Sequence, residues 1–106
     1  RIMFIDCKSG ALGPRIGRVD FSQTGQTLYY RGHQFKPVNG YKYNYVDVET
    51  EDEYWISGCK KRGGDTLYGG IIEIDDDVRE EYWTTIRNMP DSKDQRSIKC
   101  PGKYAK

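Results

Sequence analysis

Short runs in which apolar and polar residues alternate limit most strongly the folds open to this chain. The clearest run is RVDFSQTGQTLYYRG, residues 18–32. Successive side chains of a β-strand point to opposite faces of a sheet, so this period of two predicts strands. Gly25, in a four-residue loop at 23–26, can adopt the positive φ of a hairpin loop. The resulting register sets Phe21 opposite Leu28, Val19 opposite Tyr30 and Arg18 opposite Arg31.

Residues 43–74 predict two further hairpins that share one strand. In YNYVDVETEDEYWIS, an odd loop centred on Thr50–Asp52 aligns Val48 with Tyr54, which keeps the apolar residues on one face. The pair Gly63-Gly64 suits a type I′ turn, because this turn needs positive φ at both central positions. That turn would set Ile56 against Ile71. The expectation is a three-stranded antiparallel meander.

DDDVREEYWTTIRNMP, residues 75–90, is the one segment with helical spacing. An Asp from 75–77 is expected to cap a helix at about 76–89, and Pro90 to end it. Its apolar stripe comprises Val78, Tyr82, Ile86 and Met89. Trp83 lies at the edge of this stripe, four residues from both Arg79 and Arg87, which are expected to stack on the indole.

The predicted fold class is mainly β, of the α+β kind. We expect a small, curved, antiparallel sheet or an SH3-like barrel with one C-terminal helix packed on it. Residues 1–90 would form a single β-rich domain that ends in the helix. Residues 91–106 are polar and predict a loosely ordered tail.

Charge and cysteine content narrow the function classes. The chain of 106 residues has a net charge of only +1, but residues 1–40 hold six basic and two acidic residues, whereas 71–89 hold two basic and six acidic. Three widely spaced cysteines do not form a disulfide framework and favour a reducing compartment, so the cytoplasm is expected. No apolar run approaches the ~20 residues of a membrane span, and no membrane partner is expected.

The outer face of the first hairpin is the candidate binding surface. Cations there are interleaved with aromatic side chains, and the proposed residues are Arg18, Tyr29, Arg31, Phe35 and Lys36. Tyr and Arg are frequent hot spots in protein interfaces. The sequence therefore predicts a non-catalytic binding module for a protein partner. The alternative is single-stranded nucleic acid on the same face, because aromatic rings stack on bases and cations follow phosphates.

A small cysteine-dependent enzyme that uses Cys59 is a further alternative. Lys60 and Lys61 follow this thiol, nearby cations lower a thiol pKa, and His33 is the chain's one histidine. No nucleophile motif accompanies them, so Cys59 and His33 are weak catalytic candidates. The cysteines and His33 lack zinc-ligand spacing, Asp75–Asp77 are explained by helix capping, and no metal or cofactor is expected.

The segments YWISGCKKRGGDTLYGG, EIDDDVREEYW and RIGRVDFSQTGQTLYYRG also carry a family resemblance. Across most of residues 1–90 the chain resembles a family of small, uncharacterised bacterial proteins. The resemblance implies a bacterial cytoplasmic protein. It assigns no functional residue.

Overall fold

The computed structural model describes residues 1–8, 13–61 and 68–102. Strands dominate this part of the chain, which confirms the prediction of a mainly β fold. The strands are β1 (Ile2–Cys7), β2 (Arg15–Arg18), β3 (Asp20–Phe21), β4 (Leu28–Tyr30), β5 (His33–Pro37), β6 (Tyr45–Asp47), β7 (Glu53–Gly58), β8 (Tyr68–Ile74) and β9 (Ser97–Gly102). The helical turns are α1 (Arg79–Glu81), a π-helical turn η1 (Tyr82–Ile86) and a 3₁₀ turn η2 (Pro90–Ser92).

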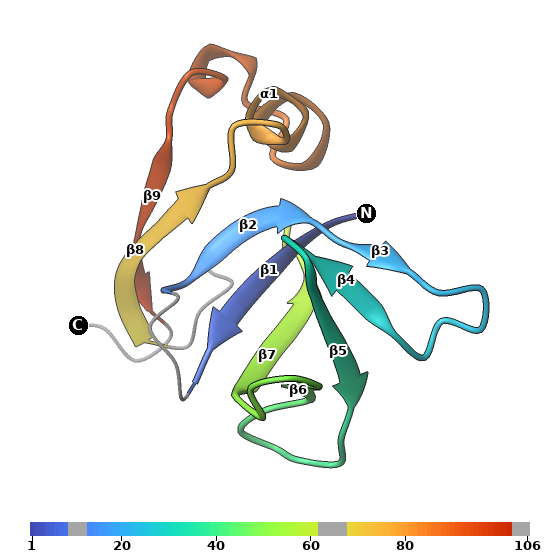
Figure 1. The fold of residues 1–106 in the computed structure, drawn as a ribbon. Helices are drawn as coiled ribbons and strands as arrows, with labels where there is room; N and C mark the ends of the chain where they lie inside the picture. The colour runs from blue at the N-terminus through green and yellow to red at the C-terminus, as the bar shows by residue number, and fades with distance from the viewer. Residues whose placement is uncertain (9–12, 62–67, 103–106) are drawn as a thin grey trace.

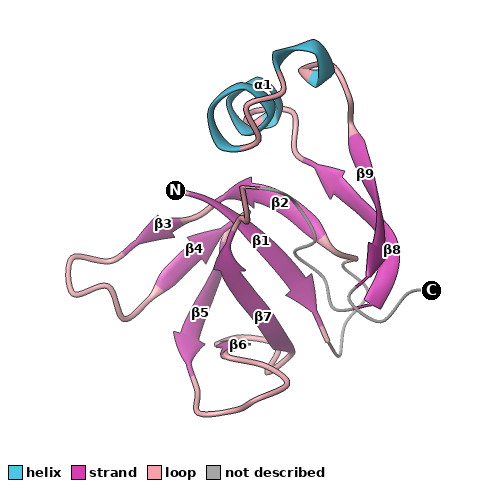
Figure 2. Ribbon diagram, turned by 180° about the vertical axis from the view of Figure 1, so that it is seen from behind, coloured by secondary structure: helices cyan, strands magenta, loops and turns pink. Residues whose placement is uncertain are grey.

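The strands form one sheet in the order β3-β4-β5-β6-β7-β1-β2-β8-β9. Figure 1 shows α1 at one end of the molecule, above β2 and reached through β8, with β3 to β7 toward the other end. The view from behind in Figure 2 shows the same separation. Only Val19 separates β2 from β3, so the two strands form one continuous run. In this run β2 pairs with β1, and β3 pairs with β4.

Strand β1 is buried on both faces, which places two core clusters on either side of it. Ile2 and Phe4 pack into a first cluster with residues of β2, β8 and the helical turns. Met3 and Ile5 pack into a second cluster with residues of β4, β5 and β7. Because the side chains of a strand alternate between faces, four consecutive apolar residues can serve both clusters.

The first predicted hairpin is confirmed in its register. Asp20 pairs with Tyr29 and Phe21 with Leu28, and Gly25 has a φ of 75°. Leu28 is fully buried, whereas 42% of Phe21 remains exposed, so the apolar face of this hairpin is only partly covered.

The second hairpin has a different register from the one predicted. Tyr54 pairs with Tyr45 rather than with Val48, and the loop closes where the Asp47 amide donates to the Asp52 carbonyl at 2.9 Å. The reason lies in the Asp47 side chain. Its carboxylate accepts hydrogen bonds from the amides of Glu49 and Thr50 and thereby fixes the loop, whatever the match of apolar faces.

The predicted meander of residues 43–74 is wrong. The neighbours of β7 are β6 and β1, whereas β8 pairs in parallel with β2 and antiparallel with β9. In this position Ile72 and Ile74 are buried in the first core cluster beside the helical turns. The predicted turn at Gly63-Gly64 lies outside the described residues.

The helix is shorter and less regular than predicted. It begins at Arg79, its N-cap position is Val78, and no side chain caps it. From Tyr82 it continues as a π-helical turn, where the Arg87 amide donates to the Tyr82 carbonyl at 3.0 Å. Trp83 is buried rather than peripheral. The guanidinium of Arg87 lies 5.4 Å from the Trp83 ring centroid, which confirms that predicted stacking, whereas Arg79 pairs with Asp76.

The polar C-terminal segment is not a loose tail up to residue 102. Residues 97–102 form β9, in which Ile98 pairs with Ile72 and packs against the first core cluster. The indole of Trp83 also donates to the carbonyl of Gln95 at 3.0 Å. In the described part of the chain, no helix is long and apolar enough to cross a membrane.

Candidate functional site

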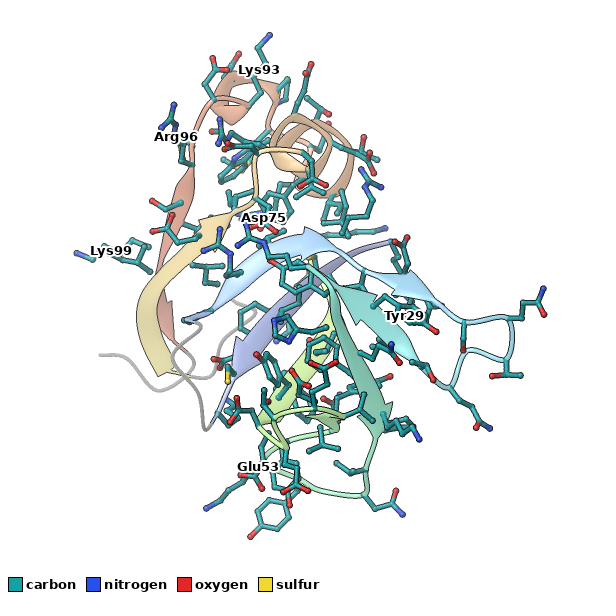
Figure 3. All side chains as sticks on the ribbon, viewed as in Figure 1. Tyr29, Glu53, Asp75, Lys93, Arg96 and Lys99 are labelled. Carbon is teal, nitrogen blue, oxygen red and sulfur yellow. The ribbon has the colours of Figure 1, made fainter. Side chains whose placement is uncertain are left out.

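An open cleft of about 560 Å³ lies where β2, the β4–β5 turn, the end of β8 and the start of β9 meet (Figure 3). It is lined mainly by charged side chains. The lining residues are Arg15, Arg18, Tyr30, Arg31, Glu73, Ile74, Asp75, Asp76, Asp77, Arg79 and Arg96. Five are arginines and four are acidic, so the formal charge of the lining is +1.

Asp75 forms the floor of this cleft and is 5% exposed. Its Oδ1 accepts two hydrogen bonds from Arg15, at 2.9 and 2.7 Å, and one from Arg31 at 3.0 Å. Its Oδ2 accepts the Tyr30 hydroxyl at 2.5 Å. A buried carboxylate needs such partners because its desolvation is costly. Asp75 thus ties β2 and the β4–β5 turn to the segment between β8 and α1.

The pKa values of its partners are shifted by the same contacts. Burial raises the pKa of the Tyr30 phenol, and the adjacent Asp75 carboxylate raises it further. Burial alone would lower the pKa of Arg15, but its hydrogen bonds and charge interaction with Asp75 outweigh this and raise it. Tyr30 therefore stays neutral and Arg15 charged at physiological pH.

Arg31 is held in an uncommon backbone conformation at the edge of the cleft. Its φ is 49° and that of Gly32 is 80°, as a two-residue turn between the paired Tyr30 and His33 requires. A non-glycine residue at positive φ is uncommon, and arginine is not among the residues enriched there. The guanidinium bonded to Asp75 compensates for this strain, while the Arg31 side chain stays 51% exposed.

The remaining arginines of the cleft differ in how far they are paired. Arg18 donates to Glu81 at 3.1 Å and lies 3.9 Å from Asp77, with 40% of its side chain exposed. Arg96 directly precedes β9; it is exposed, its side chain points outward, away from Asp75 (Figure 3), and it forms no ion pair with another described residue. Arg18 and Arg31 are therefore the paired arginines of the cleft that keep a large exposed fraction.

The structure divides the predicted binding surface into three parts. Arg18 and Arg31 line the same cleft. Tyr29 and Lys36 are exposed on β4 and β5 but do not line it. Phe35 is fully buried in the second core cluster, where its ring centroid lies 4.7 Å from that of Tyr54, so it cannot contact a partner. Phe35 is therefore a wrong assignment within that surface.

The two catalytic candidates lie against different core clusters. Cys59 packs against the first cluster, and its thiol points to the Ile2 carbonyl at 3.9 Å. His33 Nδ1 lies 2.8 Å from the Asp47 carboxylate, and its ring stands beside Phe35 of the second cluster. Among the described residues, no group of three or more His, Cys, Asp and Glu side chains could hold a metal ion.

Sequence reasoning missed Arg15, Tyr30, Asp75 and Arg96 as site residues. The sequence predicts only that one of Asp75–Asp77 caps the helix, whereas Asp75 is the buried acceptor of the cleft. One signal was available. The basic block of residues 1–40 and the acidic block of residues 71–89 are complementary, and the cleft forms where the two blocks meet.

The fold and the cleft define a mainly β protein with an arginine-lined, partly self-neutralised site. No protein-family model matches this chain, and no curated protein and no solved structure matches it significantly.

Proposed function

We propose that this protein is a non-catalytic binding module that recognises an acidic segment of a protein partner in its arginine-lined cleft. The observation that carries the proposal is the half-exposed guanidinium of Arg31, oriented by the buried Asp75 at the edge of an open cleft. Arginine presents several donors in a rigid fork that suits carboxylates. An orienting contact lowers the entropy that the side chain loses on binding.

The placement of the aromatic side chains favours a protein partner over single-stranded nucleic acid. Nucleic-acid grooves combine cations with rings on which bases stack. Tyr29 lies away from the cleft, Phe35 is buried, and Tyr30 is 3% exposed.

The pairing of residues 15–21 supports an SH3-like barrel as the finer description of the fold. These residues form one continuous run, in which β2 pairs with β1 and β3 pairs with β4. The run would therefore connect the first and last strands of the series β4-β5-β6-β7-β1 and close it into a barrel. In this proposal the cleft lies at the rim of the barrel, beside the helical turns. The family resemblance and the cysteine content support a bacterial cytoplasmic setting for the module.

Fluorescence anisotropy with a labelled polyglutamate peptide and a labelled oligothymidylate tests the proposal. We expect the peptide to bind, and the double variant Arg18→Ala, Arg31→Ala to weaken binding at least about tenfold. Lys36→Ala and Lys99→Ala are the matched controls, because both lysines are exposed and neither lines the cleft. Equal affinities of the double variant and the controls would contradict the proposal.

The same measurement separates the nucleic-acid alternative. If oligothymidylate bound more tightly than the peptide, with an affinity that fell steeply with salt, the module would be a nucleic-acid binder. The cysteine-dependent alternative predicts that a thiol reagent modifies Cys59 far faster than Cys7 near neutral pH. We expect comparable rates, because each thiol packs against a core cluster.

A further inference from the structure

Two arginines of the cleft share a single carboxylate oxygen at its floor. Arg15 donates to Asp75 Oδ1 through Nε at 2.9 Å and through Nη2 at 2.7 Å, and Arg31 donates to the same atom through Nη2 at 3.0 Å. Because both Nη2 atoms lie within 3.0 Å of one oxygen, the two guanidinium groups are neighbours. Neighbouring cations repel each other unless anions balance both of them.

Asp75 balances only one of these two positive charges. Among the described residues, neither Arg15 nor Arg31 forms an ion pair with any other acid. The Tyr30 phenol, which donates to Asp75 Oδ2, is neutral and adds no negative charge. Glu73 is the neighbour of Arg15 in the ladder of β2 and β8, but it is exposed and has no ion pair within the described part of the chain. The cluster therefore keeps one positive charge that no described acid contacts.

The other acids beside the cleft do not supply the missing charge. They have cations of their own: Asp76 pairs with Arg79, and Asp77 and Glu81 pair with Arg18. Arg96 also has no ion pair with a described residue, but its side chain points away from Asp75 (Figure 3). The unbalanced charge at the floor thus belongs to Arg15 and Arg31.

Both arginines keep donors that the bonds to Asp75 do not use. A guanidinium has five N–H donors, and these bonds use two of them in Arg15 and one in Arg31. Both side chains line the cleft, and they are 22% and 51% exposed. The guanidinium carbon of Arg31 also lies 5.7 Å from the centroid of the Tyr30 ring, which helps to orient it.

We propose that Arg15 and Arg31 together hold one carboxylate of the partner, from a Glu or Asp side chain, whose charge balances the cation that Asp75 leaves unbalanced. This inference rests on the proposed function and adds Arg15 as the second anchor of its ligand. A carboxylate carries one negative charge and accepts charge-assisted hydrogen bonds at both oxygens. A phosphate group carries about −1.5 to −2 charges at neutral pH, more than this cluster balances.

NMR titration of the isotopically labelled protein with acetate, at constant ionic strength, tests the inference directly. We expect the side-chain Nε–H signals of Arg15 and Arg31 to shift together and to saturate at the same acetate concentration. Acetamide has a similar shape without the charge and should leave both signals unmoved. Inorganic phosphate should need about tenfold higher concentration than acetate for the same shifts.

Arg15→Lys tests the planar set of donors rather than the charge. Lysine keeps the cation but presents a compact ammonium in place of the guanidinium fork. We expect the variant to weaken the binding of acetate and of labelled polyglutamate about tenfold. Arg1→Lys is the matched control, because Arg1 is exposed and does not line the cleft, so both affinities should stay as they are. The titration of the unaltered protein decides the inference even if Arg15→Lys does not fold.

The outcomes separate this inference from the proposed function. If polyglutamate binds through the cleft but acetate shifts only Arg31 or neither arginine, the shared site is overturned and the acidic-partner module stands. The same holds if phosphate binds more tightly than acetate, if all arginine signals drift in parallel without saturation, or if folded Arg15→Lys binds acetate as tightly as the wild type. Failure of both acetate and polyglutamate to bind overturns both proposals.

Discussion

Replacing Asp75 by Asn should destabilise the protein more than any other single change in the cleft. The substitution keeps the size of the side chain but removes a carboxylate that accepts four hydrogen bonds from three residues. Removing one partner of a buried ion pair typically costs 3–5 kcal/mol, because the other charge stays buried. The side chains of Arg15 and Arg31 are 22% and 51% exposed and can regain water, so the lower end of that range applies.

We therefore expect Asp75→Asn to lower the free energy of unfolding by about 3 kcal/mol. For a domain of this size that corresponds to a fall in Tm of roughly 12 °C. Urea and thermal unfolding followed by tryptophan fluorescence measure both quantities. Asp76→Asn is the matched control, because its side chain is 90% exposed, and it should change stability by less than about 0.5 kcal/mol. A difference below about 1 kcal/mol between the two variants would refute the argument that Asp75 joins the segments around the cleft.

Three further predictions follow from the packing and from the pKa of a second buried carboxylate. A Cβ added at Gly17 would lie 2.6 Å from Asp75 Oδ2, so Gly17→Ala should lower the free energy of unfolding in urea by about 2 kcal/mol. A Cβ at Gly70 meets no atom within 4 Å, so the control Gly70→Ala should lower it far less. Equal effects of the two variants would contradict the close approach at Gly17. Burial alone would raise the pKa of Asp47, but hydrogen bonds from the following loop amides and a neighbouring imidazole outweigh burial, and the pKa in the folded protein is lowered. The carboxylate therefore stabilises the fold above the pKa of Asp47 in the unfolded chain, and this stabilisation is lost as the pH falls through the lower pKa of the folded protein. Asp47→Asn should cost about 2 kcal/mol at pH 7, and the difference from the wild type should shrink in urea titrations toward pH 3; a difference independent of pH would contradict the shift. Ile98→Ala should cost about 1–2 kcal/mol in the same assay if β9 covers the first core cluster, and an unchanged stability would show that the segment is dispensable.

The first hairpin was predictable because everything that sets its register is local. Residues 18–32 contain the alternation, the loop and the glycine with positive φ, and the register follows from them. In the second hairpin the alternation correctly predicts strands, but the register depends on Asp47. The hydrogen bonds of its carboxylate to the loop amides outweighed the matching of apolar faces.

The site was predictable only in part, for a related reason. Arg18 and Arg31 were identified because they flank one hairpin, and they do line one cleft. Phe35 was misassigned because an aromatic residue in a strand fits either face, and only the packed core shows which one. The acceptor of the site, Asp75, lies 44 to 60 residues along the chain from the residues that bond it, a separation that no local pattern spans.

By itself the sequence determined that this chain forms short strands with one helical segment near Pro90, because side-chain periodicity depends on neighbouring residues. The tertiary structure decided which strands pair. It placed β8 beside β2 rather than β7, and it turned residues 97–102 into an edge strand. Backbone donors and acceptors are alike in every strand, so pairing depends on which arrangement buries the most apolar surface and satisfies the buried charges. Here that arrangement brought the basic and acidic blocks together around Asp75.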